Sequence, residues 1–293
     1  MSIIKTLSKK CIIRPPQFLS ENIHYETMMG SVAYGVSSEK SDIDLYGFCI
    51  PPKDFIFPHL RGEIPGFGTP GPRFEQYQQH HIQDHETQYD IAIYSIVKYF
   101  QLCMQNNPNM IDSLFTPLRC VRHATQVGHL VREHRKLFLH KGCWHTFRGY
   151  AWAQLHKMES QQRVGSRKDI IERYGYDVKF AYHVVRLISE VEQLLTTGDL
   201  DLERDREVLK AIRRGEWSLE KIKVWFSERE VGLQTLYEKS SLPASPREEE
   251  IKDLLLSCIE HHYGHLSEEC VVITDKATLA MREVRSIVDK YGF

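Results

Sequence analysis

The 293-residue sequence predicts an α+β protein, in which a short mixed sheet flanked by helices is followed by a helical C-terminal domain. The first third carries short strand-like runs separated by glycine and proline, whereas apolar residues recur at helical spacing beyond Arg119. A strand-rich segment followed by a helical one indicates two packed units, each with its own kind of layer. We expect a first domain over residues 1–135 and a helical second domain over residues 136–293.

Three strands are expected in the first segment. The strand His24–Met29 runs into a glycine-serine turn, and Ser41–Ile50 ends at two prolines, which cannot continue a hydrogen-bonded ladder. A third strand is expected over Gln88–Ile93. The stretch His59–His85 between the second and third strands is rich in glycine, proline and histidine and predicts irregular structure. It either shapes a binding site or is an insertion, and both readings stay open.

The expected helices follow from apolar residues spaced three and four apart. The first of them stops at an Asn-Asn-Pro sequence, and a Thr-Thr-Gly sequence marks the C-terminal end of another. Pro246 is expected near the first turn of the last helix, where a missing N–H costs nothing. The helices are predicted over Ile96–Gln105, Ala124–Leu139, Trp144–Gln162, Asp177–Leu195, Asp205–Arg214, Leu219–Lys239 and Pro246–His261.

The composition excludes several classes of protein. Hydrophobic residues make up 42% and charged residues 26%, which is ordinary for a globular protein. A formal charge of −1 gives no overall basic field, so RNA or a nucleotide would have to be bound by a local basic cleft. No apolar run is long enough to span a bilayer, and the N-terminal one is too short for a signal peptide. We therefore expect a cytoplasmic protein with no membrane partner.

Cysteines and histidines form no recognised ligand pattern. The seven cysteines are scattered without a C-x-x-C pair, so they are expected to be buried thiols in a reducing compartment rather than disulfides or zinc ligands. The fifteen histidines contain no H-E-x-x-H motif. The pairs His80-His81 and His261-His262 are expected to be solvated surface residues.

The most informative pattern is a Gly-Ser turn followed about ten residues later by Ser-Asp-x-Asp. Asp42 and Asp44 are two residues apart on an expected strand, so both carboxylates point to one face and can bind one metal ion. Gly30 lets the backbone approach a phosphate closely, and Ser31 offers a hydroxyl and an N–H. Hard oxygen ligands beside a phosphate-holding turn suit Mg²⁺-dependent phosphoryl or nucleotidyl transfer.

Two-metal chemistry commonly uses a third carboxylate, which should lie on a neighbouring strand with its side chain on the same face. Asp90 is the best candidate, because Ile91 and Ile93 would then face the core. Asp84 and Glu86 precede the expected strand and are weaker rivals. Asp112 is also weaker, because N-capping at a loop or helix start explains it.

The pattern matches a known family signature. Written out, it is Gly30-Ser31-x₂-Tyr34-Gly35-x₅-Ser41-Asp42-x-Asp44, and it resembles the signature of the DNA polymerase β-like nucleotidyltransferase superfamily. Later segments resemble one branch, a predicted RNA-repair-pathway nucleotidyltransferase family, and the similarity covers about residues 20 to 225. These segments are residues 90–100, 107–109, 114–115, 149–158, 179–187, 197–199 and 212–215.

The resemblance implies a polymerase β-like N-terminal domain and a two-metal reaction, in which a hydroxyl displaces pyrophosphate from a nucleoside triphosphate. Asp42 and Asp44 would bind Mg²⁺, with Mn²⁺ as an alternative ion. Asp90 would complete the ligand set and orient or deprotonate the acceptor. Gly30 and Ser31 would hold the triphosphate.

A helical stripe is a further candidate for nucleotide binding. Lys179, His183 and Arg186 fall at i, i+4 and i+7 of one expected helix, opposite an apolar face. The stripe either contacts phosphate or base, or is a solvated face, and both alternatives stay open. Lys157 either extends this basic lining toward an RNA strand or is surface charge, and both alternatives stay open. Tyr150, Trp144 and Trp152 are expected in the core rather than as platforms on which bases stack.

Three functions remain open at this stage. The leading one is a nucleotidyltransferase that uses a nucleoside triphosphate such as ATP and an RNA or tRNA end as acceptor. A second keeps the chemistry but transfers to a protein or a small molecule. A third is a non-catalytic nucleotide-binding or toxin–antitoxin module. The sequence does not decide the preferred triphosphate, the number of nucleotides added or the oligomeric state.

Overall fold

The structure is a computed structural model. It describes residues 2–37, 41–60, 62–66, 68–69, 71, 73–160, 166–264 and 276–291. Among these residues, no helix combines the length and the apolar character needed to cross a membrane.

The strands form one five-stranded mixed sheet with the order β3-β4-β2-β1-β5. Strands β2 and β4 pair in parallel, whereas the other neighbours pair antiparallel. This arrangement confirms the α+β class and the mixed sheet. The strands are β1 Ile23–Met28, β2 Ile43–Cys49, β3 Gln76–Asp84, β4 Thr87–Ser95 and β5 Val121–Ala124.

The helices begin and end mostly where the sequence places capping residues. Asp177 accepts a hydrogen bond from the Lys179 N–H at the start of α9, and Gly198, at φ 62°, ends that helix. The helices are α1 Ile3–Lys9, α2 Gly30–Ala33, α3 Lys53–Ile56, α4 Ile96–Met104, α5 Pro108–Phe115, α6 Gln126–Glu133, α7 Cys143–Ser160, α8 Ser166–Tyr174, α9 Val178–Thr197, α10 Arg206–Arg213, α11 Leu219–Lys239, α12 Glu248–Tyr263 and α14 Lys276–Tyr291.

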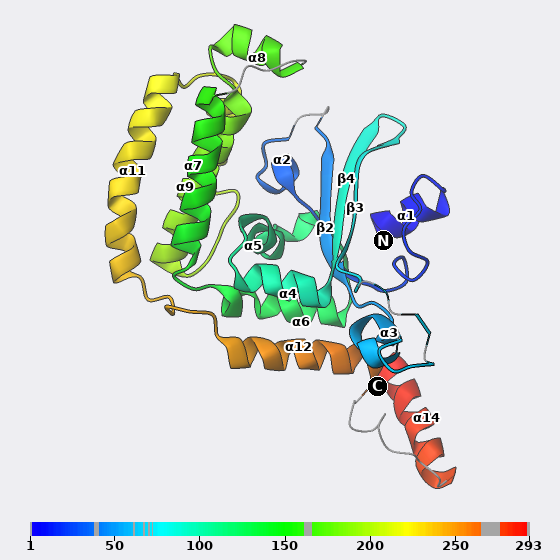
Figure 1. Cartoon of the computed structure of the whole chain (residues 1–293). Helices are drawn as coiled ribbons and strands as arrows, with labels where there is room; N and C mark the ends of the chain where they lie inside the picture. Colours follow the sequence, from blue (N-terminus) through cyan, green and yellow to red (C-terminus); the bar gives the residue numbers. More distant parts are fainter. Residues whose placement is uncertain are drawn as a thin grey trace.

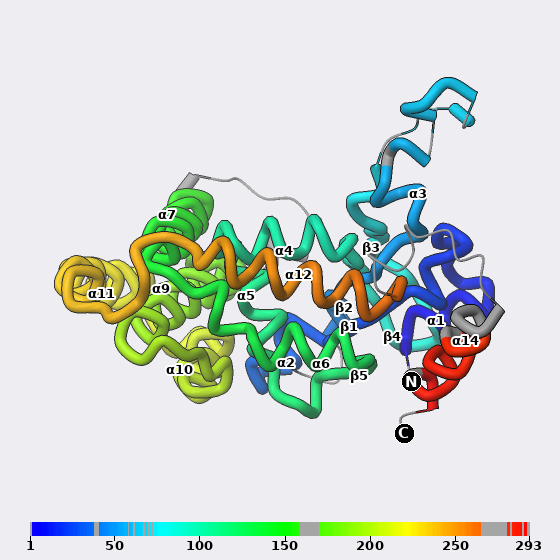
Figure 2. The backbone as a smooth tube through the Cα atoms, turned by 90° about the horizontal axis from the view of Figure 1, so that it is seen from below, coloured from blue at the N-terminus to red at the C-terminus, as the bar shows by residue number. Residues whose placement is uncertain are grey.

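The layers are visible in Figure 1. Helices α4, α5 and α6 lie on one side of the sheet and α1 lies on the other, while α7, α9 and α11 form a further helical layer beyond α5. Helix α12 contacts α6 and α4 as it runs from α11 back to the sheet, and Figure 2 shows this path from below. The chain after residue 135 therefore returns to the sheet that the first segment builds.

Two of the five strands were not expected. Strand β3 lies inside the stretch His59–His85, and it is an edge strand with a single buried residue, Ile82. A polar edge strand lacks the alternation of apolar and polar residues that identifies a half-buried strand, so the sequence did not predict β3. Strand β5 is the other edge and takes up Ala124, which the sequence assigned to a helix.

The predicted helix Ala124–Leu139 is wrong in extent. Thr125 caps α6, which ends at Glu133 and is followed by a 3₁₀ turn over Arg135–Phe138. Pro246 lies before the N-cap of α12, not in its first turn. Helix α7 ends at Ser160, and the last two residues of its predicted range lie outside the described residues.

Apolar clusters cover both faces of the sheet. Ile4, Leu45 and Ile91 belong to the cluster on the α1 side. The larger cluster on the opposite side runs continuously from Phe48 of β2 to Val184 of α9. Because this cluster contains residues of both expected segments, the division into two domains near residue 135 stays a prediction.

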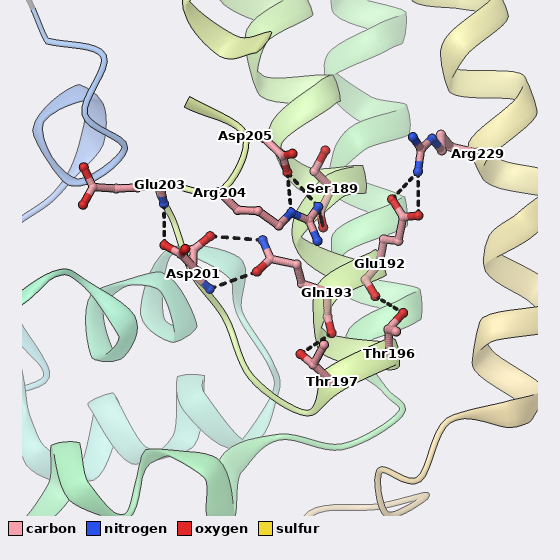
Figure 3. Close-up of polar contacts among 10 residues, drawn as sticks. All are labelled: Ser189, Glu192, Gln193, Thr196, Thr197, Asp201, Glu203, Arg204, Asp205 and Arg229. Atoms are coloured by element: carbon pink, nitrogen blue, oxygen red, sulfur yellow. Dashed lines mark hydrogen bonds and ion pairs between the residues drawn. The ribbon is translucent and has the colours of Figure 1, made fainter. Parts of the chain in front are cut away.

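Helix α9 is buried along most of its length, and of the basic stripe Lys179 is exposed, His183 is half-buried and Arg186 is buried. Helices α7, α10 and α11 all pack against it. Polar side chains on its C-terminal half hold the next elements in place (Figure 3). The Gln193 amide donates to the Asp201 carbonyl at 3.1 Å and accepts from the Asp201 N–H at 3.0 Å, and Glu192 accepts from Arg229 of α11 at 2.6 Å.

A histidine pair joins α12 to the sheet. Nε2 of His24 lies 2.9 Å from Nδ1 of His262, and Nδ1 of His24 lies 2.7 Å from the Thr125 hydroxyl. His262 is therefore half-buried and paired, not a solvated surface residue as expected. Burial, assisted by His262 and His123, lowers the pKa of His24 to about 3.

This contact predicts that stability is lost on acidification. The unfolded chain protonates His24 below about pH 6.5, whereas the folded chain does not until far lower pH, so this group favours unfolding as pH falls. Its contribution should approach about 1.4 kcal/mol per pH unit between pH 6 and 5. We expect His24→Gln to remove this slope, measured as the difference between wild-type and variant unfolding free energies in urea. Parallel curves for the two proteins would contradict the pKa assignment.

Candidate active site

The parallel pairing of β2 and β4 brings two aspartates together. Asp44 and Asp90 are direct register partners, so their side chains leave the same face of the sheet. Asp42 precedes β2 by one residue and shares this side, while Ile43 and Leu45 pack against the α1-side cluster. The alternation expected from the sequence is therefore present, and the register places carboxylates side by side.

These aspartates line a cleft with two lobes. The carboxylate lobe, of about 610 Å³, contains Asp42, Asp44 and Asp90 together with Gly30 and Ser31. The second lobe, of about 240 Å³, contains two tyrosines and is called the tyrosine lobe below. Both lobes are lined by Gly30, Asp44, Lys179, His183 and Arg186. Four further cationic or aromatic residues of the helical segment line the carboxylate lobe, namely Arg173, Tyr174, Tyr182 and Arg213.

Negative charge is concentrated at Asp44. Burial, assisted by Asp90 and Asp42, raises the pKa of Asp44 to about 6, while Lys179 and His80 act in the opposite direction. A cation beside the three carboxylates would relieve this repulsion, and carboxylate oxygens are ligands that Mg²⁺ prefers.

Within the described residues, no three His, Cys, Asp or Glu side chains already form a closed metal-ligand cluster. Mg²⁺ is commonly held by one or two carboxylates together with substrate phosphates and water. The donor set therefore fits an ion that binds with a nucleotide, with Asp44 and Asp42 as the ligands nearest the turn.

The unexpected strand β3 holds the carboxylate of Asp90. The His81 N–H donates to Asp90 Oδ1 at 2.7 Å, and His80 Nδ1 lies 3.5 Å from Oδ2. This contact depends on an irregularity between Gln79 and Ile82, where His81 adopts a φ of 55°. The pair His80-His81 is exposed as expected, but it is part of the aspartate cluster rather than free surface.

The rival carboxylates are placed elsewhere. Asp84 pairs with Lys10 at 2.6 Å at the far end of β3, and Glu86 is exposed in the turn that follows. Neither lines the carboxylate lobe. Asp112 is not a capping residue, because it lies inside α5 and is completely buried. Among the candidates, Asp90 is the one that lies beside Asp44.

Gly30 has no tolerance for a side chain. It opens α2 with a φ of 60°, and a Cβ at this position would lie 2.0 Å from Asp44 Oδ2. The adjacent Met29 N–H donates to the Asp44 carbonyl at 2.7 Å. The turn and the aspartate are thus packed together, which a Gly-Ser pair in the sequence alone does not reveal.

Gly30→Ala is therefore expected to reduce activity about a hundredfold or more, because displacement of reacting groups by about 1 Å costs that much. The left-handed backbone adds about 1–2 kcal/mol of strain. Gly232→Ala is the matched control, because nothing lies within 4 Å of a Cβ on this exposed residue of α11. Activity measurements and thermal unfolding check both variants. Unchanged turnover in Gly30→Ala would contradict the close packing.

Arg186 lies in a buried polar cluster rather than on a solvated stripe. It is 7% exposed, donates to the Tyr34 hydroxyl at 2.8 Å and lies 3.4 Å from Asp112 Oδ2 and 3.7 Å from Glu190 Oε1. The Tyr34 hydroxyl donates to Asp112 at 2.5 Å. Because Tyr34 directly follows α2, this cluster ties the Gly30 segment to α5 and α9.

The cluster holds two carboxylates for one guanidinium. Burial raises the pKa of Asp112 and of Glu190, and Asp112 adds to the effect on Glu190, while Arg186 opposes both shifts. The raised pKa values favour protonation of the acids and so lower the carboxylate charge that Arg186 has to balance. Removing the arginine would leave buried acids without their cation.

The remaining sequence candidates separate into two groups. Exposed Lys179 and half-buried His183 reach both lobes, as expected of nucleotide-binding residues, although Arg186 reaches them from a buried position. Lys157 is exposed on α7 and lines neither lobe. The expectation that Tyr150 lies in the core is wrong, because it is 46% exposed and lines the tyrosine lobe. Trp152 is also exposed, at 44%, rather than buried in the core.

Sequence reasoning missed several residues that line the two lobes. Arg213 lies in a segment that carried the family resemblance, which is the only signal that pointed to it. Its guanidinium donates to the Val36 carbonyl at 2.8 Å. Asn109 and Gln154 also lie in segments that carried the resemblance, whereas no pattern distinguished Arg173 from an ordinary surface residue.

A mixed sheet with aspartates on adjacent parallel strands, packed against a glycine turn, is an arrangement that suits a divalent ion and a phosphate. The model of the RlaP family, described as the RNA repair pathway DNA polymerase beta family, matches residues 11–254, and the chain belongs to this family. This membership confirms the resemblance found in the sequence and supports nucleotidyl transfer as the general activity.

Among solved structures, the chain is similar to a nucleotidyltransferase-like protein from Exiguobacterium sibiricum 255-15. The similarity covers 89% of this chain and 79% of that chain, with 10% sequence identity and a TM-score of 0.29. No curated protein matches the chain.

Proposed function

We propose that the protein is a Mg²⁺-dependent nucleotidyltransferase that moves a nucleoside monophosphate from a nucleoside triphosphate to a hydroxyl at an RNA or tRNA end. The acceptor oxygen forms a bond to the α-phosphorus, the bond to pyrophosphate breaks, and pyrophosphate leaves with its electron pair. The observation that carries this proposal is the register pairing of Asp44 with Asp90 beside Gly30.

The residues of the carboxylate lobe have separate roles in the proposed reaction. Gly30 and Ser31 offer the close backbone approach and the hydroxyl that hold phosphates. Lys179 and Arg213 line the same lobe and neutralise phosphate charge. Asp90, whose carboxylate is oriented by the His81 N–H, accepts the proton of the attacking hydroxyl.

Asp42 and Asp44 would hold the divalent ion, Mg²⁺ or alternatively Mn²⁺. When bound, the ion stabilises the negative charge that builds up on the phosphate oxygens during transfer. The raised pKa of Asp44, caused first by burial and then by Asp90 and Asp42, supports this assignment. The helical segment after residue 135 is proposed as the second domain, which closes the cleft over the nucleotide.

The RNA acceptor is supported by the family description and by a local basic surface. Arg173, Lys179 and Arg213 all line the carboxylate lobe of a chain whose overall charge is −1. Transfer to a protein or small-molecule hydroxyl uses the same residues and is the second candidate. A non-catalytic nucleotide-binding or toxin–antitoxin module is the third, and the presence of all three aspartates in one lobe counts against it.

The cytoplasm is the proposed location. The six described cysteines are free thiols, and all except Cys11 are buried. Free buried thiols suit a reducing compartment.

A labelling experiment distinguishes these acceptors. The protein is incubated with Mg²⁺ and each of the four α-labelled triphosphates, together with total RNA, purified tRNA or an RNA-depleted protein and metabolite extract. We expect label on RNA or tRNA. Label on protein or metabolites alone would overturn the RNA acceptor. Nucleotide binding without any labelled product would favour the non-catalytic module.

A further inference from the structure

The face of the sheet that carries the aspartates continues into tyrosines. Tyr46 follows Asp44 by two residues on β2 and therefore points to the same side. Its ring lies 6.4 Å from that of Tyr94 on β4. Tyr150 of α7 lines the tyrosine lobe together with Tyr46. Three tyrosines thus gather next to the carboxylates.

The tyrosine lobe also contains two side-chain amides. Asn109 of α5 and Gln154 of α7 line it, and Gln154 lies one helical turn after Tyr150, on the same face of α7. Within the described part of the chain, neither side-chain amide has a hydrogen-bond partner. Each amide offers both a donor and an acceptor, which is the chemistry that reads the edge of a nucleobase.

The spacing fits one nucleotide lying along β2. Two residues of a strand span about 6–7 Å, which separates an α-phosphate at Asp44 from a ring at Tyr46. A base placed there would contact Tyr46 and Tyr150, and stacking of a base on an aromatic ring is worth about 1–3 kcal/mol. The volume of the tyrosine lobe, about 240 Å³, is small compared with the volumes typical of ligand sites. It therefore suits a single base rather than a nucleic-acid strand.

The residues that line each lobe indicate whether the tyrosine lobe holds the donor nucleotide or the acceptor. Gly30 and Asp44 border both lobes, so a triphosphate held at Gly30 can extend directly into the tyrosine lobe. Asp90, which receives the proton of the acceptor, borders only the carboxylate lobe. The acceptor therefore reaches the α-phosphate from the side of β4 and β3, and the tyrosine lobe is left for the donor.

We propose that the tyrosine lobe binds the base of the donor nucleoside triphosphate, with Tyr46 and Tyr150 as its aromatic walls and Asn109 and Gln154 as the residues that select the base. This inference rests on the proposed function, because it requires a triphosphate at Gly30 and Asp44. It makes base selection a property of the protein itself, independent of any template strand.

Equilibrium binding tests the inference separately from catalysis. Titration calorimetry with Mg²⁺ compares non-hydrolysable α,β-methylene analogues of ATP, GTP, CTP and UTP with inorganic tripolyphosphate. We expect the wild type to prefer some bases over others by at least tenfold. Asn109→Ala and Gln154→Ala should each reduce this preference several-fold without changing tripolyphosphate affinity, and Tyr150→Ala should weaken all four nucleotides. Gln234→Ala is the matched control, because its exposed amide on α11 bonds to Glu238.

The outcomes separate the two proposals. Equal affinity for all four analogues in the wild type, or an unchanged preference in both amide variants, would overturn the base pocket. Unchanged nucleotide preference with a raised KM for the RNA acceptor would assign the lobe to the acceptor, which also overturns it but leaves the transferase intact. Absence of any binding, including tripolyphosphate, would instead contradict the proposed function.

Discussion

Replacing Asp44 with asparagine is expected to lower nucleotidyl transfer by about a thousandfold or more while the fold survives. The carboxylate is the one that borders both lobes and touches the glycine turn, so its loss removes a metal ligand at the centre of the site. Transfer from α-labelled triphosphate to the acceptor measures the effect.

Stability should change in the opposite direction to activity. Burial and the neighbouring carboxylates raise the folded-state pKa of Asp44. The protonated Asp44 side chain is therefore favoured in the folded protein, and the stability that it contributes is lost as pH rises from about 4 through about 6. At pH 7 the ionised group therefore destabilises the fold, and an amide removes that cost. The Tm of Asp44→Asn should equal or exceed that of the wild type.

Two variants complete this test. Asp42→Asn should lose activity in the same way, whereas Asp253→Asn, an exposed carboxylate on α12, should change neither activity nor Tm. Asp90→Asn should also be inactive, and retained activity would assign the role of the third carboxylate to Glu86 or Asp84. Full activity in the Asp42 and Asp44 variants together would make the metal assignment wrong.

The second large effect concerns stability. Arg186→Met is expected to lower the unfolding free energy by about 3–5 kcal/mol at pH 7, because breaking a buried ion pair leaves its partners uncompensated. The change removes the cation that faces Asp112 and Glu190 and the donor to Tyr34. Urea denaturation measures the loss.

Arg229→Met is the matched control on the same helical layer. Its guanidinium pairs with Glu192 of α9 at 2.6 Å but is 47% exposed, and exposed pairs contribute about 0–1 kcal/mol. Combining Arg186→Met with Asp112→Asn should cost less than the sum of the two single variants, because the second change removes an unpaired charge. Equal losses for the two arginine variants, or strict additivity, would refute the buried cluster.

The aspartate pair was predictable because its signal is local. Alternation around Ile43 and Ile91 places Asp44 and Asp90 on strand faces away from the apolar residues. Their direct pairing was not predictable, because parallel register is set by the tertiary structure and not by either strand alone. The orientation of Asp90 depends further on β3, a polar edge strand that carries no clear alternation.

The burial of Arg186 was not predictable for a related reason. A helical wheel groups Arg186 with Lys179 and His183, but it contains no information about which element packs against that face. Asp112 of α5 meets Arg186 there and converts a basic stripe into a buried ion cluster. Lys157, which was a candidate to extend the basic lining, lines neither lobe, whereas Arg213, much farther along the chain, lines the carboxylate lobe.

The proposed reaction is defined by which phosphorus atom is transferred. Once an acceptor is labelled, the wild-type protein with Mg²⁺ should transfer label from an α-labelled triphosphate and release label from a γ-labelled one as pyrophosphate. Asp44→Asn should do neither. Transfer of the γ-label to the acceptor would identify a phosphotransferase and contradict nucleotidyl transfer.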